Sequence, residues 1–161
     1  MKLPGFKNTT DENACPCGSG KSYAKCCETY HHGTPPPTAE ALMRARYSAY
    51  TMANDQYLRN TWHPGSRPEK ISLKNNKNLQ WTKLEILRKE KGKGKDKLGV
   101  IEFKAWYRSD DQNGYLHEVS NFVKEENTWL YFDGEVTIQS DDVVDDFKDF
   151  QPVRRRLSVE P

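Results

Sequence analysis

The sequence predicts an α+β protein in which a few helices are followed by an antiparallel sheet. Apolar residues recur at helical spacing between residues 38 and 62, and from residue 83 onward the period switches to two, with turn residues between the segments. All four cysteines lie earlier, within residues 15–27. Helices followed by a run of strands indicate an α+β domain, and the clustered cysteines indicate a small module ahead of it.

The composition is that of a folded chain. Of the 161 residues, only 35% are hydrophobic, but eighteen aromatic residues (Trp 4, Tyr 8, Phe 6) offset this thin core because each can bury a large area. The first residues contain no apolar run typical of a signal peptide, and no later stretch approaches the ~18 apolar residues of a membrane span. We therefore expect a cytoplasmic protein without a membrane span. In that reducing compartment, clustered cysteines favour a metal over disulfides.

The cysteine module has the pattern C-x-C-x8-C-C, formed by Cys15, Cys17, Cys26 and Cys27. Four sulfurs suit an ion that takes thiolates at tetrahedral corners about 2.3 Å away, and zinc is the usual occupant. A segment this short cannot bury a core of its own, so metal binding would supply most of its folding free energy. Disulfides or free reactive thiols are the alternative. Spacing and compartment together favour a metal, although spacing alone does not distinguish zinc from iron.

The segments before the sheet are predicted from caps, prolines and helical spacing. The first helix begins at Thr38, a good N-cap residue directly after three prolines, and a second, shorter helix runs from Gln56 to Trp62. The prolines hold the backbone extended and so form a short, stiff linker. The expected order is a flexible lead-in over 1–14, the cysteine module over 15–33, the proline linker over 34–37, and the main domain over 38–138.

The strands are predicted from alternating residues and from the turns between them. Residues 66–78 are expected to be irregular, with one short strand around Ile71–Leu73. The fourth strand is expected to end at Asp133-Gly134, a favoured hairpin dipeptide. Residues 139–161 are expected to form an acidic and then basic tail that is partly disordered. The four predicted strands cover residues 83–88, 100–107, 115–124 and 128–132, with a Gly/Lys hairpin loop at 91–97.

The charges are unevenly spread along the chain, although the net charge is only +2. Residues 67–108 hold thirteen Lys/Arg against five Asp/Glu, and residues 109–150 hold two against twelve. A nucleic-acid or ribosome-binding groove is one interpretation of the basic segment. Neighbouring strands with solvated faces explain the same charges more simply, because pairing the two segments would cancel much of the field.

Two stretches of the sequence resemble known families. The run Cys15-Pro16-Cys17-Gly18-Ser19-Gly20-Lys21, with Tyr23 and Cys26-Cys27, resembles the SEC-C motif known from the tail of the preprotein translocase motor ATPase. The later runs resemble the YchJ-type bacterial proteins. These runs are Ala41 to Tyr50, Tyr57-Leu58, Thr61 to Pro64, Phe103 to Ala105, Leu116 to Val123, and Trp129 to Gly134, so that the match covers about residues 14–136.

The resemblance implies a zinc-binding SEC-C module followed by a cone-shaped α+β domain like nuclear transport factor two. Such cones wrap a curved sheet around the first helices and leave a cavity at the open end. On the third predicted strand, Glu118, Ser120 and Phe122 share one face. The resemblance therefore implies a cavity whose candidate lining residues are Tyr47, Tyr57, Trp62, Trp106, Glu118, Ser120, Phe122 and Tyr131.

Glu118 is the candidate general base if the protein is an enzyme, because desolvation would raise the pKa of a buried carboxyl. The simpler interpretation is structural: a buried carboxylate needs a partner in either case, and Arg44 or Arg46 on the first helix could provide it. A cavity of ~300 Å³ or more facing Glu118 would support a ligand site, whereas a closed, packed cone would exclude one.

These observations lead to three functional interpretations. The first is a non-enzymatic zinc protein whose SEC-C module docks onto a protein partner, by analogy with the translocase motif. The alternative is a small-molecule enzyme or carrier that uses the cone cavity, with Glu118 as polar anchor. The third and weakest is binding to nucleic acid or the ribosome through residues 67–108.

Overall fold

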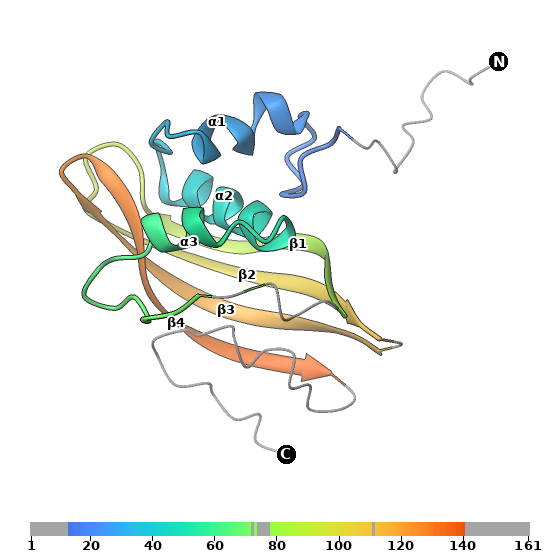
Figure 1. Ribbon diagram of the computed structural model, residues 1–161. Helices are drawn as coiled ribbons and strands as arrows, with labels where there is room; N and C mark the ends of the chain where they lie inside the picture. The colour runs from blue at the N-terminus through green and yellow to red at the C-terminus, as the bar shows by residue number, and fades with distance from the viewer. Residues whose placement is uncertain (1–12, 72, 74–77, 111, 141–161) are drawn as a thin grey trace.

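The computed structural model describes residues 13–71, 73, 78–110 and 112–140. Helices lie over one face of a curved four-stranded antiparallel sheet with strand order β1-β2-β3-β4 (Figure 1). This confirms the predicted α+β class. In chain order, the elements are the 3-10 turn η1 (Tyr23–Lys25), the helices α1 (Cys27–His31), α2 (Ala39–Thr51) and α3 (Asp55–Asn60), and the strands β1 (Leu79–Lys91), β2 (Leu98–Ser109), β3 (Gln112–Glu125) and β4 (Thr128–Ser140).

Helix α2 begins where the sequence predicts. The Thr38 side chain accepts a hydrogen bond from the Ala41 backbone N–H at 3.0 Å, which satisfies one of the free donors of the first turn. Leu42, Ala45 and Ala49 are buried along one stripe of the helix. These small and branched side chains let the helix pack closely between the sheet and the N-terminal module.

Helix α3 is one residue earlier at its start, and two residues shorter at its end, than the predicted Gln56–Trp62 segment. Asn54 caps it by accepting from the Tyr57 backbone N–H at 3.1 Å. Trp62 lies beyond the helix and forms an isolated parallel bridge with Tyr131 of β4. The chain around Trp62 therefore forms backbone hydrogen bonds with β4 instead of a last helical turn. The helical spacing of Leu58 and Trp62 does not reveal this pairing.

The strands are longer than predicted. Alternation along β2 is as expected, since Ile101, Phe103 and Ala105 are buried while their neighbours are less so. The expected short strand at 71–73 is not observed in the part of that segment that the structure describes, residues 71 and 73. The Gly/Lys loop connects β1 and β2 as predicted, between strands that end at Lys91 and begin at Leu98.

The expected hairpin at Asp133-Gly134 is wrong. Strand β4 continues through this dipeptide, with Gly134 paired to Ser120 and Asp133 paired to Asn121 of β3. The turn between β3 and β4 lies where the predicted strands leave it, at Glu126 and Asn127, which have positive φ angles of 51° and 63°, as a type I′ hairpin requires.

The cysteine module packs directly on α2, on the side away from the sheet (Figure 1). The Arg44 side chain donates to the Cys17 backbone carbonyl at 2.7 Å, and the His31 ring lies 2.8 Å from the Ala45 carbonyl oxygen. Cys15, Cys17 and Cys27 are accordingly part of the same buried cluster as the main core. The helix is thus enclosed between the module and the sheet.

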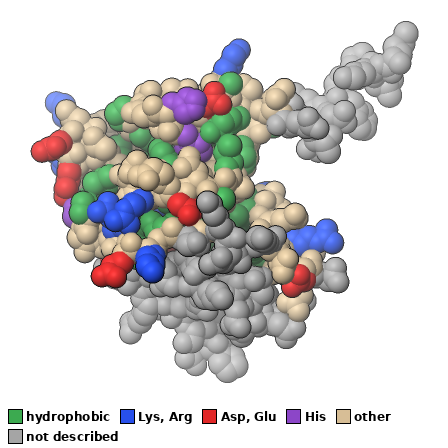
Figure 2. Space-filling view, in the orientation of Figure 1, with side chains coloured by type: hydrophobic (Ala, Val, Ile, Leu, Met, Phe, Trp, Pro, Cys, Tyr) green, Lys and Arg blue, Asp and Glu red, His purple; other side chains and the backbone are tan. Residues whose placement is uncertain are grey.

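The basic and acidic segments contribute neighbouring strands, as predicted, because β2 pairs with β3. Glu102 of β2 contacts Arg88 of β1 at 2.9 Å and His117 of β3 at 2.7 Å. Figure 2 shows basic and acidic side chains interspersed over the face that carries the helices. No helix among the described residues is long and apolar enough to cross a membrane. Most of the expected lead-in and tail, residues 1–12 and 141–161, lies outside the described residues.

Candidate metal centre and interior cavity

The four cysteine sulfurs converge on one point in the module. One Sγ from each of Cys15, Cys17, Cys26 and Cys27 lies within 4.8 Å of all the others. The Cys17–Cys26 distance is 3.6 Å and the Cys26–Cys27 distance is 4.0 Å. A tetrahedral ion with bonds of about 2.3 Å needs sulfurs about 3.8 Å apart. The donor set therefore fits a single thiolate-binding metal ion.

The local backbone explains this convergence. The Cys15 backbone N–H donates to the Lys21 carbonyl at 2.9 Å, which closes the loop that carries the first two cysteines. Gly18 and Gly20 turn this loop with φ angles of 79° and 87°, a region that favours glycine. Cys26 and Cys27 return at the start of α1.

The sulfurs are close enough to change one another's pKa. The hydrogen bond to Cys15 raises the pKa of Cys17, and hydrogen bonds to Cys15 and Cys17 raise the pKa of Cys27, with burial and the charge of neighbouring sulfur adding to both effects. A divalent cation held by the four sulfurs would offset this charge. Cys26 is half-buried, whereas the other three are buried.

His31 anchors the module to the main domain. Its ring nitrogens lie 2.7 Å from the Tyr23 hydroxyl and 2.8 Å from the Ala45 carbonyl oxygen. The ring also packs on Tyr57, with centroids 4.6 Å apart. Tyr57, expected in the cavity, therefore belongs to the contact between module and helices.

A groove runs between the module and α2 beside the sulfurs of Cys26 and Cys27. Its volume is about 350 Å³. Lys21 and Arg44 contribute positive charge to it, and Glu40 contributes a carboxylate that is 3.0 Å from Arg44 and 2.9 Å from Lys89. One wall of this groove is formed by the module and the other by α2, and contacts such as the hydrogen bond from Arg44 to the Cys17 carbonyl hold the two walls together.

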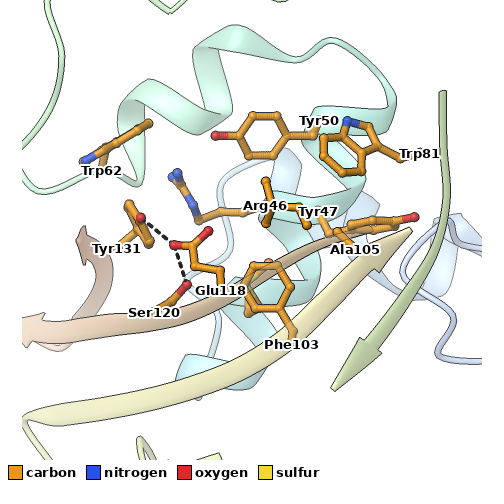
Figure 3. A pocket seen from close by; sticks show the side chains of 12 residues that line it. Arg46, Tyr47, Tyr50, Trp62, Trp81, Phe103, Ala105, Glu118, Ser120 and Tyr131 are labelled. Carbon is orange, nitrogen blue, oxygen red and sulfur yellow. Dashed lines mark hydrogen bonds between the residues drawn. The ribbon is translucent and has the colours of Figure 1, made fainter. Parts of the chain in front are cut away.

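The interior cavity lies between α2 and the sheet (Figure 3). Its volume is about 30 Å³. Five of the eight predicted lining residues are found there: Tyr47, Trp62, Glu118, Ser120 and Tyr131. The other lining residues are Met43, Arg46, Tyr50, Trp81, Phe103, Ala105 and Leu116.

Trp106 and Phe122 do not line this cavity. Trp106 alternates with the inward Phe103 and Ala105, so it lies on the opposite face of the sheet, where its ring is 4.8 Å from that of Tyr115. Phe122 is buried and packs on the Tyr131 ring at 5.7 Å, away from the cavity.

Sequence reasoning missed several lining residues. Met43, Arg46 and Tyr50 are spaced by three and four residues, so they share one face of α2 next to the predicted Tyr47. That helical spacing is the signal that could have found them.

Glu118 is the buried carboxyl at the polar end of the cavity. Its side chain is 2% exposed. Ser120 Oγ and Tyr131 Oη each donate to Glu118 Oε2 at 2.7 Å (Figure 3). Desolvation raises the pKa of Glu118 in spite of these two hydrogen bonds and the nearby positive charge of Arg46.

The expected ion pair between Glu118 and Arg44 or Arg46 is not formed among the described residues. Arg44 pairs with Glu40 instead. Arg46 donates to the Leu58 carbonyl and the Thr61 hydroxyl, and its guanidinium lies over the Trp62 and Tyr131 rings, 5.0 and 4.6 Å from their centroids. Two hydroxyl groups, rather than an arginine, satisfy the carboxyl.

Gly134 makes room for this carboxyl. It lies opposite Ser120 on the neighbouring strand, and a Cβ atom at this position would overlap Glu118 Oε2. The glycine interpreted as a turn residue therefore has a packing role in the middle of β4.

Comparison with known proteins finds a matching family model for each of the two parts of the chain. The family model of the YchJ middle NTF2-like domain matches residues 38–134, and that of the SEC-C motif matches residues 13–29. The chain belongs to the YchJ family. Its similarity to solved structures agrees with this assignment, since the SEC-C motif protein RPA3114 of Rhodopseudomonas palustris superposes with a TM-score of 0.66 at 29% identity, covering 74% of this chain and 95% of that one.

Other relatives of this YchJ-family chain align with it over most of their own length. The UPF0225 protein SCO1677 of Streptomyces coelicolor is 45% identical over 122 residues, which is 75% of this chain and 94% of the relative. A UPF0225 protein of Deinococcus radiodurans is 42% identical, covering 74% of this chain and 86% of the relative. A SEC-C motif protein of Psychrobacter arcticus has a TM-score of 0.63 at 29% identity, covering 74% of this chain and 80% of that one.

Proposed function

We propose that this YchJ-family chain binds one zinc ion through its four cysteines, and that the module stabilised in this way is a docking element for a partner protein. The observation that carries the proposal is the convergence of Cys15, Cys17, Cys26 and Cys27, whose Sγ atoms all lie within 4.8 Å of one another. Four thiolates leave zinc no open position for substrate, so the metal has a structural role. A cytoplasmic location, where thiols stay reduced, is part of the proposal.

The groove between the module and α2 is the proposed docking surface. Lys21 is exposed, and Arg44 extends from α2 beside it. Lys25, on the same module, is also exposed. Charge complementarity therefore favours an acidic segment of a partner protein. Because Arg44 also holds the Cys17 carbonyl, the groove depends on the folded module.

Metal analysis tests the first part of the proposal. Purified protein is expected to contain about one zinc per chain, and the Cys26→Ser, Cys27→Ser double variant is expected to contain much less because two thiolate ligands are missing. Stoichiometric iron in the wild-type protein would contradict the identity of the metal.

Affinity capture tests the second part. Lys21→Glu reverses a charge in the groove and leaves all four cysteines in place, so it is expected to lose partners that the wild-type protein retains. Lys70→Glu is the matched control, because Lys70 is exposed and lines a different pocket with Asp55 and Arg59. The same partners captured at the same level by wild type, Lys21→Glu and the double cysteine variant would exclude docking through the module.

The cavity gives little support to an enzyme with a substrate of ordinary size. Its volume of about 30 Å³ is roughly a tenth of the ~300 Å³ of a small ligand pocket. The docking interpretation is therefore preferred.

A further inference from the structure

The four sulfurs of the proposed metal centre differ in their access to solvent. Cys15 is 5% exposed and Cys17 and Cys27 are 0% exposed, whereas Cys26 is half-buried. Cys26 also lines the groove between the module and α2. Cys27 lies on the same groove, but its side chain is covered. A small reagent from solvent therefore reaches Cys26 before the other three sulfurs.

Polar residues surround Cys26 at the edge of this groove. The Ser19 hydroxyl oxygen lies 3.2 Å from Cys26 Sγ and accepts a hydrogen bond from the Lys21 backbone N–H at 3.2 Å. Ser19 and Lys21 are exposed and also line the groove, which has room for several molecules the size of water. Exposure and thiolate character decide which cysteines oxidise. Because all four ligands of a bound metal are thiolates, exposure singles out Cys26 for a small polar oxidant.

Cys17 is the sulfur best placed to form a disulfide with Cys26. The two Sγ atoms are 3.6 Å apart, and Cys27 Sγ is 4.0 Å from Cys26 Sγ. Cys26 and Cys27 are consecutive, so their Cα atoms are about 3.8 Å apart across a trans peptide. Disulfides usually join Cα atoms about 4.4–6.8 Å apart. The pair Cys26–Cys27 is therefore disfavoured, and Cys17 is the expected partner.

We propose that hydrogen peroxide oxidises the zinc-loaded module at Cys26, and that Cys17 then forms a disulfide with Cys26. The inference rests on the proposed zinc binding. Cys26 Sγ attacks one peroxide oxygen: an S–O bond forms, the O–O bond breaks, and the second oxygen takes up a proton and leaves as water. Cys17 Sγ then displaces hydroxide from the sulfenic acid of Cys26. The hydroxide takes up a proton, so two thiolates lose two electrons and one peroxide becomes two waters.

The disulfide changes both the metal site and the proposed docking surface. It leaves only two of the four thiolates for zinc, so the ion is expected to be released. Arg44 donates to the Cys17 carbonyl at 2.7 Å and lines the groove, so the backbone that moves with Cys17 is part of the docking surface. A thiol reductant reverses the disulfide by exchange. Peroxide therefore regulates the module reversibly.

Peroxide treatment of the zinc-loaded full chain tests the proposal, with a zinc-binding dye to follow release and alkylation with mass spectrometry to identify oxidised cysteines. The first product is expected to be the Cys17–Cys26 disulfide, with one zinc released per disulfide, and dithiothreitol with added zinc is expected to restore the metal. Zinc content is measured before peroxide is added. Absence of zinc at that point would contradict the proposed function itself. First oxidation at Cys15 or Cys27, or zinc retained after the disulfide forms, would overturn only the present inference.

Two histidine variants provide a matched comparison. Cys26→His and Cys27→His each replace one sulfur by a ring nitrogen that zinc also accepts as a ligand. Cys26→His lacks the accessible sulfur and is expected to release zinc about tenfold more slowly than wild type under peroxide. Cys27→His keeps Cys26 and Cys17 and is expected to release zinc at close to the wild-type rate. Equal rates in the two zinc-loaded variants would overturn the role of Cys26, and the product formed first in the wild type tests it without relying on either variant.

Discussion

At the scale of single residues, Gly134 and Glu118 depend on each other. Gly134→Ala is expected to displace the Glu118 carboxyl, because the new Cβ overlaps Oε2, and to weaken the hydrogen bonds from Ser120 and Tyr131. The expected loss is about 1–3 kcal/mol in the free energy of unfolding, measured with urea. In a Glu118→Ala background, the same glycine substitution should cost much less. Equal costs in both backgrounds would show that Gly134 has another role.

The raised pKa of the buried Glu118 carboxyl predicts how the stability of the protein depends on pH. Burial raises its pKa above 4.5, so between 4.5 and the raised value the folded state binds a proton that the unfolded state releases. The stabilisation from this proton is complete below about 4.5 and is lost as the pH rises through the folded-state pKa. Urea unfolding of wild type and Glu118→Gln over a pH series should show the wild type losing up to about 1.4 kcal/mol per pH unit relative to the variant. A constant difference would contradict the shift.

At the scale of elements, His31 connects α1 to α2. His31→Leu is expected to remove contacts with the Tyr23 hydroxyl and the Ala45 carbonyl and to lower the free energy of unfolding by about 1–3 kcal/mol, since buried polar partners lose hydrogen bonds. His32→Leu is the control, because the adjacent His32 is exposed. Urea unfolding of both variants measures the difference, and equal destabilisation would exclude the specific role of His31.

The elements show where sequence patterns suffice and where they fail. Thr38 and the alternation along β2 are local signals, and they predicted the start of α2 and the inner face of the strand. The Asp133-Gly134 dipeptide has the composition of a turn, but long-range pairing with β3 keeps it in a strand. Trp106 could have been excluded from the cavity by the period of two, which places it opposite Phe103.

At the scale of the whole molecule, the sequence predicted two parts better than it predicted their contact. The four cysteines are a local pattern, and their convergence on one site follows from it. The contacts that join the module to α2 span long distances in sequence: Arg44 to Cys17 is 27 residues and Cys15 to Ser48 is 33 residues. The spacing of apolar residues along the chain does not predict such long-range pairs. Only the structure therefore shows that α2 is enclosed between the module and the sheet.

This enclosure and the proposed metal ion together predict that the module and the main domain unfold in one step. Cys17 and Cys27 are fully buried in the same cluster as Leu42 and Leu58, so loss of the metal should expose one side of α2 and weaken its packing on the sheet. A strong chelator is therefore expected to lower the melting temperature of the whole protein in a single transition, followed by tryptophan fluorescence, because Trp62 and Trp129 are buried in the main domain. The Cys26→Ser, Cys27→Ser variant should melt at the lower temperature with or without chelator. An unchanged tryptophan transition in the chelated wild type would show instead that the module folds independently of the sheet and its helices.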